Sequence, residues 1–184
     1  MFLVTIDKWS CPVSSIKPCE VPPGSFLRKY KDNNGYADCY VAEVTGTVSQ
    51  AAFIEAFYTS GLFKVERTIL KHLVSRPSTD AEAKQLANGG TDRFAAWRVE
   101  GRSASELLLT DFTGRTRSWL MAAPFDDGAI GVGTRLYFGS AVVAHRSRGG
   151  ENAGMGWVFH ALLGFHRLYS RLLLRAAKNG VRPT

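Results

Sequence analysis

The stretch GWVFHALLGFHRLYSRLLLRAAK, residues 156–178, decides the fold that the sequence predicts. At about 100° per residue, an α-helix over this range has one apolar side and one basic side. The apolar side holds Phe159, Leu162, Leu163, Phe165, Leu172 and Leu173, with His166 and Tyr169 among them. The basic side holds His160, Arg167, Arg171, Arg175 and Lys178. We therefore expect a long closing helix that packs an apolar side with two polar tips against the domain.

Strand patterns precede this helix. The segment YADCYVAEV, from Tyr36, alternates in polarity and is rich in aromatic and β-branched residues. Later segments of the same kind are RFAAWRVEGR (93–102), ELLLTDF (106–112), TRSWLMAAP (116–124) and TRLYFGSAVVAH (134–145). The turns between these later segments are short, so we expect an antiparallel meander.

The segment between the first predicted strand and the later ones has apolar residues at the spacing of a helix. Apolar residues recur at three- and four-residue steps from Gln50 to Val74, and Ser49 can cap that stretch. Thr79 and Glu82 stand at capping-box spacing before a second, short helix. The class is therefore α+β, with two or three helices after the first strand and the long helix at the end.

Length and composition limit the domain count. The chain has 184 residues, of which 45% are hydrophobic, and this is enough for one domain with a real core. Residues 1–35 hold four of the seven prolines, at 12, 18, 22 and 23, so we expect an irregular arm there. Residues 36–184 form the predicted domain.

Several function classes lack support in the sequence. No stretch approaches the roughly 20 apolar residues of a membrane span, and we expect a cytoplasmic protein without membrane contact. The three cysteines have no metal-ligand spacing, so neither a metal nor a disulfide framework is predicted. The net charge of +7 is spread along the chain, which favours a solvated basic face over a nucleic-acid partner.

The predicted order of elements has a consequence for ligand binding. A curved sheet with a polar-tipped helix across it does not close tightly everywhere, so we expect a pocket between the two. This arrangement resembles the START-like, helix-grip superfamily (SRPBCC), which includes polyketide cyclases and lipid carriers.

Particular phrases resemble a bacterial domain family of unknown function. They are YADCY, AFYTSGLF, RPSTDAEAKQLANGG, DRFAAWRVE, DFTGRTRSWL, LYFGSAVV and LLGFHRLYSRLLL, within about 36–178. The family occurs alone and also fused behind an atypical short-chain-dehydrogenase NAD(P)-binding domain, and its element order is similar to that of START-like proteins. Residues 1–35 contain no GxGxxG, so we expect this chain to bind no nicotinamide cofactor by itself.

Three charged residues are candidates for ligand binding. A three-residue hairpin loop at Thr113–Arg115 would place Asp111 opposite Arg117, and the preceding hairpin would place Asp111 near Arg98. An arginine held in this way offers donors to a carboxylate, enol or phenolate oxygen of a ligand. The alternative is an ion-pair ladder on the solvent side, and a one-residue slip would change the face.

His166 and Tyr169 are the candidate catalytic residues. An imidazole and a phenol three residues apart on one helix face can act as base and acid, or hold one polar group of an apolar ligand. The alternative is a buried histidine with a partner on the sheet, because burial without one costs about 1 to 3 kcal/mol. The expected apolar walls are Trp97, Trp119, Tyr137, Phe138, Trp157 and Phe165.

The sequence leaves three functions open. The first is a binding domain for a hydrophobic or aromatic small molecule. The second is a cofactor-independent cyclase, dehydratase or isomerase, in which His166 transfers the proton, Tyr169 assists and Arg98 or Arg117 stabilises an enolate. The third is an interaction module for a separate dehydrogenase, docking through the basic side of the last helix. A homodimer is a further possible assembly.

Overall fold

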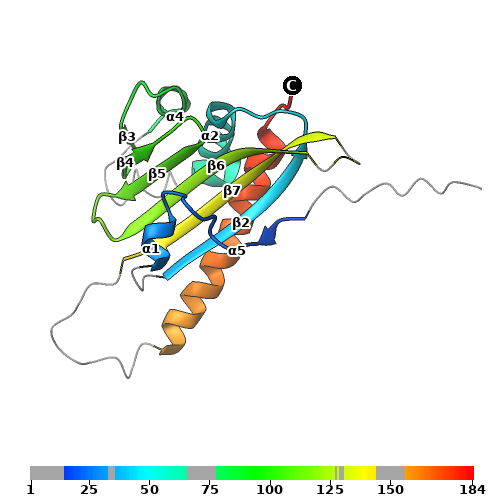
Figure 1. Ribbon diagram of the computed structural model, residues 1–184. Coiled ribbons are helices and arrows are strands. Elements are labelled where there is room, and N and C mark those ends of the chain that lie inside the picture. Colours follow the sequence, from blue (N-terminus) through cyan, green and yellow to red (C-terminus); the bar gives the residue numbers. More distant parts are fainter. Residues whose placement is uncertain (1–14, 33–35, 66–77, 127, 129–130, 144–155) are drawn as a thin grey trace, which may run out of the picture.

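Seven strands form one antiparallel sheet in the part of the chain that the computed structural model describes (Figure 1). That part comprises residues 15–32, 36–65, 78–126, 128, 131–143 and 156–184, with side chains of the last range described from residue 166 onward. The strands are β1 (Lys17–Pro18), β2 (Tyr36–Thr45), β3 (Arg93–Phe94), β4 (Trp97–Arg102), β5 (Glu106–Asp111), β6 (Thr116–Asp126) and β7 (Val132–Val142). Their order in the sheet is β1-β2-β7-β6-β5-β4-β3.

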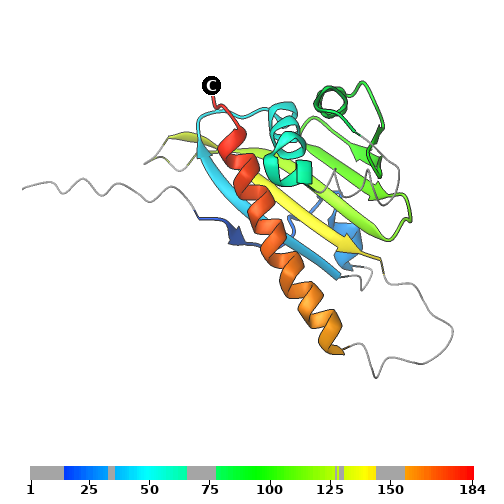
Figure 2. The same ribbon diagram turned by 180° about the vertical axis from the view of Figure 1, so that it is seen from behind.

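The helices lie on both faces of this sheet. They are α1 (Arg28–Asp32), α2 (Gln50–Thr59), α4 (Asp80–Ala87) and α5 (Gly156–Gly180). Figures 1 and 2 show α2, α4 and α5 on one face, where α5 runs obliquely across β2 and β7, and α1 on the other. We name these the helix face and the arm face.

Capping residues define where the helices begin, as the sequence predicts. The Ser49 hydroxyl accepts from the backbone N–H of Ala52 at the start of α2. Thr79 and Glu82 form the complete capping box of α4. The helical stretch expected from Gln50 to Val74 is described only as far as residue 65, and the rest lies outside the described residues.

The strands alternate between two hydrophobic cores. On the helix face, the large side chains of the main core are those of Tyr40, Phe53, Ile54, Phe57, Tyr58, Phe63, Leu86, Phe94, Leu107, Leu109, Leu120, Leu136, Phe138, Leu173 and Leu174. On the arm face, a smaller core contains Val21, Leu27, Cys39, Leu108, Trp119 and Ala141. Successive side chains of a strand point to opposite faces, so a strand buried on both sides reads as a continuous apolar run. The run Leu107-Leu108-Leu109 in β5 is an example.

Residues 15–32 close the arm face. The segment contains β1, which pairs with β2, and α1, and it buries Leu27 completely. The side chain of Glu106 anchors this segment, because one oxygen accepts from the backbone N–H of Phe26 at 2.8 Å and from Nε1 of Trp119 at 2.7 Å. The expected irregular arm is therefore, from residue 15, a packed layer over the sheet.

The α+β class, the antiparallel meander and the long last helix are confirmed, and one strand is not. The segment expected as a strand over residues 93–102 is a tight hairpin of β3 and β4, with Phe94 paired to Trp97. Ala95, in the two-residue turn, has a φ of +52°, a conformation that glycine usually supplies. The alternation of polar and apolar residues does not reveal this turn, because both turn residues, Ala95 and Ala96, are alanines.

Candidate functional site

A cavity of about 190 Å³ lies between the sheet and α5 on the helix face. We call it the inner cavity. Its lining residues come from α2, β4, β6, β7 and α5 and from the segment after α2: Phe57, Phe63, Trp97, Thr116, Arg117, Ser118, Phe138, Ser140, His166, Tyr169, Ser170 and Leu173. Both candidate catalytic residues, His166 and Tyr169, are among them. A space of this kind is where the element order predicts a pocket.

His166 is held by a hydrogen-bonded chain from the sheet. Asp38 in β2 and Ser140 in β7 are direct partners in the antiparallel register. The Ser140 hydroxyl lies 2.6 Å from Oδ1 of Asp38 and 2.7 Å from Nε2 of His166. Nε2 of His166 is 3.7 Å from Oδ2 of Asp38. The sequence predicted that a buried histidine would have a hydrogen-bond partner on the sheet. That partner is the side chain of Ser140.

The protons in this chain follow from the donors available. Ser140 has one hydroxyl proton, which it donates to Asp38, so its oxygen accepts the N–H at Nε2 of His166. Burial acts to raise the pKa of Asp38, but the adjacent imidazole of His166 and the hydrogen bond from Ser140 outweigh it, and the pKa is lowered. Asp38 contacts Nε2, the nitrogen that also faces Ser140. This is not the order of a catalytic serine triad, in which the carboxylate binds Nδ1.

Two other lining residues have buried polar atoms without a partner. Nε1 of Trp97 and Oγ of Ser170 are buried and make no hydrogen bond among the described residues. Ser170 has no exposed surface, although serine is a polar residue. Because nearly all buried polar groups in proteins are paired, these two unpaired atoms of cavity-lining residues are candidates to bind a polar group of a ligand.

Sequence reasoning did not identify Ser170 or the polar role of Trp97. A signal for Ser170 was present, because it lies four residues after His166 and three before Leu173, on the same side of the helix. Leu172 was placed on the buried side and is instead 43% exposed, whereas Leu174 is fully buried. The inward side of α5 is therefore centred near Ser170 and Leu174. Phe159, Leu162, Leu163 and Phe165 lie outside the described side chains.

The predicted cluster of Arg98, Asp111 and Arg117 does not form. Thr110, and not Asp111, is opposite Arg117 in β6 and opposite Arg98 in β4. The carboxylate of Asp111 accepts from the backbone N–H groups of Arg115 and Thr116, so it organises the hairpin turn. This turn changes the expected register by one residue, which moves the two arginines to the other face from Asp111.

Arg117 has a different acidic partner on the arm face. Its guanidinium lies 2.6 Å from Oε2 of Glu100, donates to the hydroxyl of Tyr30 at 2.9 Å, and stacks on the Tyr30 ring. Lys29 also pairs with Glu100, at 2.8 Å. Arg117 belongs to the segment of β6 that lines the inner cavity, but its guanidinium group pairs with Glu100 on the arm face.

Trp119 and Tyr137 also lie on the arm face. Their rings are 6.2 Å apart in the smaller core, and the Trp119 N–H is satisfied by Glu106. The prediction that they form walls of the pocket under α5 is therefore wrong. The two-residue repeat of a strand shows which side chains share a face of the sheet. It does not show which of the two faces the last helix covers.

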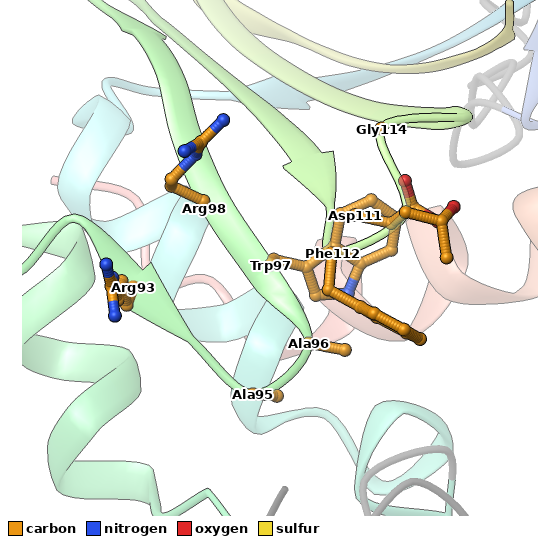
Figure 3. A pocket seen from close by; sticks show the side chains of 9 residues that line it. Arg93, Ala95, Ala96, Trp97, Arg98, Asp111, Phe112 and Gly114 are labelled. Carbon is orange, nitrogen blue, oxygen red and sulfur yellow. The ribbon is translucent and has the colours of Figure 1, made fainter. Parts of the chain in front are cut away.

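A second hollow opens at the edge of the sheet (Figure 3). This edge cleft, of about 420 Å³, is lined by Arg93, Ala95, Ala96, Trp97, Arg98, Asp111, Phe112, Thr113 and Gly114. In Figure 3, Arg93 and Arg98 lie apart from Asp111, and the Trp97 indole lies behind Asp111 and Phe112. Trp97 lines both the cleft and the inner cavity.

Comparison with protein-family models, with curated proteins and with solved structures finds no match for this chain. Within the described ranges, no three histidine, cysteine, aspartate or glutamate side chains are grouped so that they could hold a metal ion. Among the helices described, none combines the length and the hydropathy needed to cross a membrane.

Proposed function

We propose that this chain is a cytoplasmic domain of START-like, helix-grip shape that binds a hydrophobic or aromatic small molecule between its sheet and α5. The inner cavity is the observation that carries the proposal. Its walls are largely apolar, and Trp97 and Ser170 have buried polar atoms without partners among the described residues. A few polar groups in an apolar hollow are typical of small-molecule sites, because the apolar walls supply affinity and the polar groups orient the ligand.

The proposal is tested with probes and a pair of neighbouring variants. Leu173→Trp fills the inner cavity, because Leu173 lines it, whereas Leu172→Trp makes the same change on the exposed side of α5. The probes are toluene, acetophenone, 2-acetonaphthone and decanoate, and binding is measured by ligand-observed NMR with folding checked by circular dichroism. We expect at least one probe to bind the wild type and Leu172→Trp but not Leu173→Trp. Failure of all four to bind the folded wild type would contradict the proposal.

A second candidate function is a cofactor-independent cyclase, dehydratase or isomerase acting in the same cavity. The chain from Asp38 through Ser140 to His166 favours it, because it ties a proton-carrying imidazole at the cavity wall to an ionised carboxylate. In this function, His166 transfers a proton to or from a carbon or oxygen of the bound molecule, and Asp38 stabilises the imidazolium that forms.

The two functions differ in their response to His166→Phe. An enzyme would lose turnover in this variant and keep its fold and its ligand affinity, whereas a carrier would keep all of its measurable function. Ser140→Ala is the positioning control, because it leaves the imidazole in place and removes the hydroxyl that bridges it to Asp38, so that only the direct contact of 3.7 Å with Oδ2 remains. An enzyme would retain part of its rate in Ser140→Ala with a changed pH profile. Equal turnover in the wild type and His166→Phe would exclude His166 as the proton carrier.

A further inference from the structure

The size of the inner cavity limits what it can hold. Its volume is about 190 Å³. For comparison, an engineered apolar cavity of about 150 Å³ in another protein holds one benzene molecule. The inner cavity therefore encloses enough space for one six-membered ring and a short substituent, so only part of a fused ring system or a long acyl chain would lie inside it.

The walls of the cavity favour an aromatic ring. Phe57, Phe63 and Phe138 line it, and the ring centroids of Phe57 and Phe138 are 4.8 Å apart at a tilt of 46°. Aromatic rings prefer such tilted and offset contacts with one another, and each pair gains about 0.5 to 1.5 kcal/mol beyond area burial.

The unpaired polar atoms define the polar group of the ligand. The indole N–H of Trp97 donates only, so its partner must be an acceptor. The Ser170 hydroxyl can donate as well. A carbonyl oxygen can accept a hydrogen bond from either donor. Neither atom has a partner among the described residues, so a ligand acceptor would replace no existing bond.

The charges around the cavity disfavour an anion. The Asp38 carboxylate lies directly behind Ser140, and the guanidinium of Arg117 is bound to Glu100 on the other face. His166 donates to Ser140. A carboxylate ligand would thus enter an apolar space near an existing negative charge, which is costly.

We propose that the inner cavity takes a neutral, single-ring aromatic compound with a carbonyl oxygen, held by the N–H of Trp97 and the hydroxyl of Ser170. This inference rests on the proposed binding function and names the class of ligand.

Four probes and three variants test it by isothermal titration calorimetry. Acetophenone has the ring and the acceptor, ethylbenzene has nearly the same shape without the acceptor, benzoate adds a charge and 2-acetonaphthone adds a ring. Trp97→Phe keeps an aromatic ring and removes the N–H, and Ser170→Ala removes the hydroxyl. Trp119→Phe is the matched control, because it removes an indole N–H that is already bonded on the arm face.

We expect the wild type to bind acetophenone, to bind 2-acetonaphthone more weakly because only part of it lies inside the cavity, and to reject benzoate. The ratio of the ethylbenzene Kd to the acetophenone Kd should fall about tenfold in Trp97→Phe, by a smaller factor in Ser170→Ala, and not at all in Trp119→Phe. An unchanged ratio in Trp97→Phe, with both probes bound, would overturn the ligand class while the binding function stands. No binding by any of the four probes would remove the binding function itself.

A separate observation concerns two cysteines on the arm face. Sγ of Cys19 lies 3.3 Å from Sγ of Cys39, and the backbone N–H of Cys19 donates to the carbonyl of Cys39 at 2.9 Å. The pairing of β1 with β2 brings them together, since Pro18 is opposite Tyr40. Cys19 is partly exposed and Cys39 is buried.

We infer that Cys19 and Cys39 are a site of reversible oxidation by hydrogen peroxide. The Cys19 thiolate attacks one peroxide oxygen, the O–O bond breaks, and the products are a sulfenic acid and hydroxide, which takes up a proton to give the first water. The Cys39 thiol then attacks that sulfur, forming the disulfide and releasing a second water, so hydrogen peroxide accepts two electrons in all. The hydrogen bond with Cys39 lowers the pKa of Cys19, and the pKa of Cys39 is raised, so Cys19 is the attacking thiol. The disulfide would tie residues 15–32 to β2.

Peptide mapping by mass spectrometry tests this site in the native protein. After hydrogen peroxide treatment we expect a linked peptide of Cys19 and Cys39, a mass loss of about 2 Da, and recovery of both thiols with dithiothreitol. The oxidised protein should unfold about 5 °C higher than the reduced one. In Cys39→Ser, dimedone should label Cys19 as a sulfenic acid, and no stabilisation should occur. Cys11→Ser is the control and should form the same disulfide. A linkage through Cys11, or none without denaturant, would overturn the inference.

Discussion

Asp38 and Ser140 face each other across β2 and β7, and the Ser140 hydroxyl donates to Oδ1 of Asp38 at 2.6 Å. The same hydroxyl oxygen lies 2.7 Å from Nε2 of His166 and accepts a hydrogen bond from it. A carboxylate on a strand is therefore linked to an imidazole on the last helix through a single hydroxyl group. This link connects the stability of the helix contact to the charge of Asp38.

Asp38→Asn should change how stability depends on pH. Burial favours the neutral acid, but the adjacent imidazole of His166 and the hydrogen bond from Ser140 favour the carboxylate more, so the folded-state pKa is below the unfolded value of about 3.9. A lowered pKa adds stability above the unfolded pKa, and this gain is lost as the pH falls through the folded pKa. Urea unfolding should thus show a larger gap between wild type and variant at pH 7 than at pH 3. The exposed Asp92→Asn is the control. A gap that does not change with pH would contradict this account.

Glu100→Ala should destabilise the protein by about 2 kcal/mol, less than the loss of a partner from a fully buried pair. The side chain of Arg117 is 12% exposed and that of Glu100 is 22% exposed, so removing the carboxylate leaves a guanidinium poorly solvated. The exposed pair of Arg28 and Asp32 provides the comparison, and Asp32→Ala should cost less than about 0.5 kcal/mol. Guanidinium unfolding of the two variants gives both values. Equal losses of stability in Glu100→Ala and Asp32→Ala would mean that the partial burial of the Arg117–Glu100 pair does not increase its contribution to stability.

Gly139→Ala should cost about 2 to 3 kcal/mol, because overpacking a core forces neighbouring groups to move. A Cβ at this position would overlap with Cδ2 of Leu27 and lie 2.9 Å from the backbone oxygen of Asp38 and 3.1 Å from Cε3 of Trp119. Gly61→Ala is the matched control, since a Cβ there meets nothing within 4 Å. Thermal unfolding should separate the two variants by several degrees. A Gly139→Ala variant as stable as the wild type would show that residues 15–32 do not pack tightly on β7.

Ala95→Gly should stabilise the protein by about 0.5 to 1 kcal/mol, because a left-handed backbone strains any residue that has a Cβ. Ala95 has a φ of +52° in the turn between β3 and β4. The same substitution at Ala81, exposed in α4, should instead cost about 1 kcal/mol. Denaturant midpoints of the two variants should therefore move in opposite directions. A destabilised Ala95→Gly would indicate that the turn does not hold this conformation.

Much of the fold could be predicted from local patterns. Period-two and helical spacing, together with the capping residues Ser49 and Thr79, indicated β2, β5, β6 and β7, the helices α2, α4 and α5, and their order. The same spacing on the last helix placed His166 and Tyr169 toward the sheet, and both line the inner cavity. These features depend on the periodicity of one segment, which the sequence contains in full.

The candidate site was only partly predictable, because it depends on contacts between segments. The Asp111 carboxylate binds the turn after it, and the resulting one-residue change of register gives Arg117 a partner, Glu100, that no local pattern indicated. Trp119 faces residues 15–32 instead of α5, since period two assigns residues to alternate faces without saying what covers each.

The sequence by itself determined the class of fold, the amphipathic last helix and the inward position of His166. Only the tertiary structure decided which face of the sheet that helix covers, the register of the β5–β6 hairpin, and the meeting of Trp97 from β4 with Ser170 from α5. The physical reason is that periodicity sets the direction of a side chain relative to its own backbone. Its partner is set by how elements distant in the chain pack against one another.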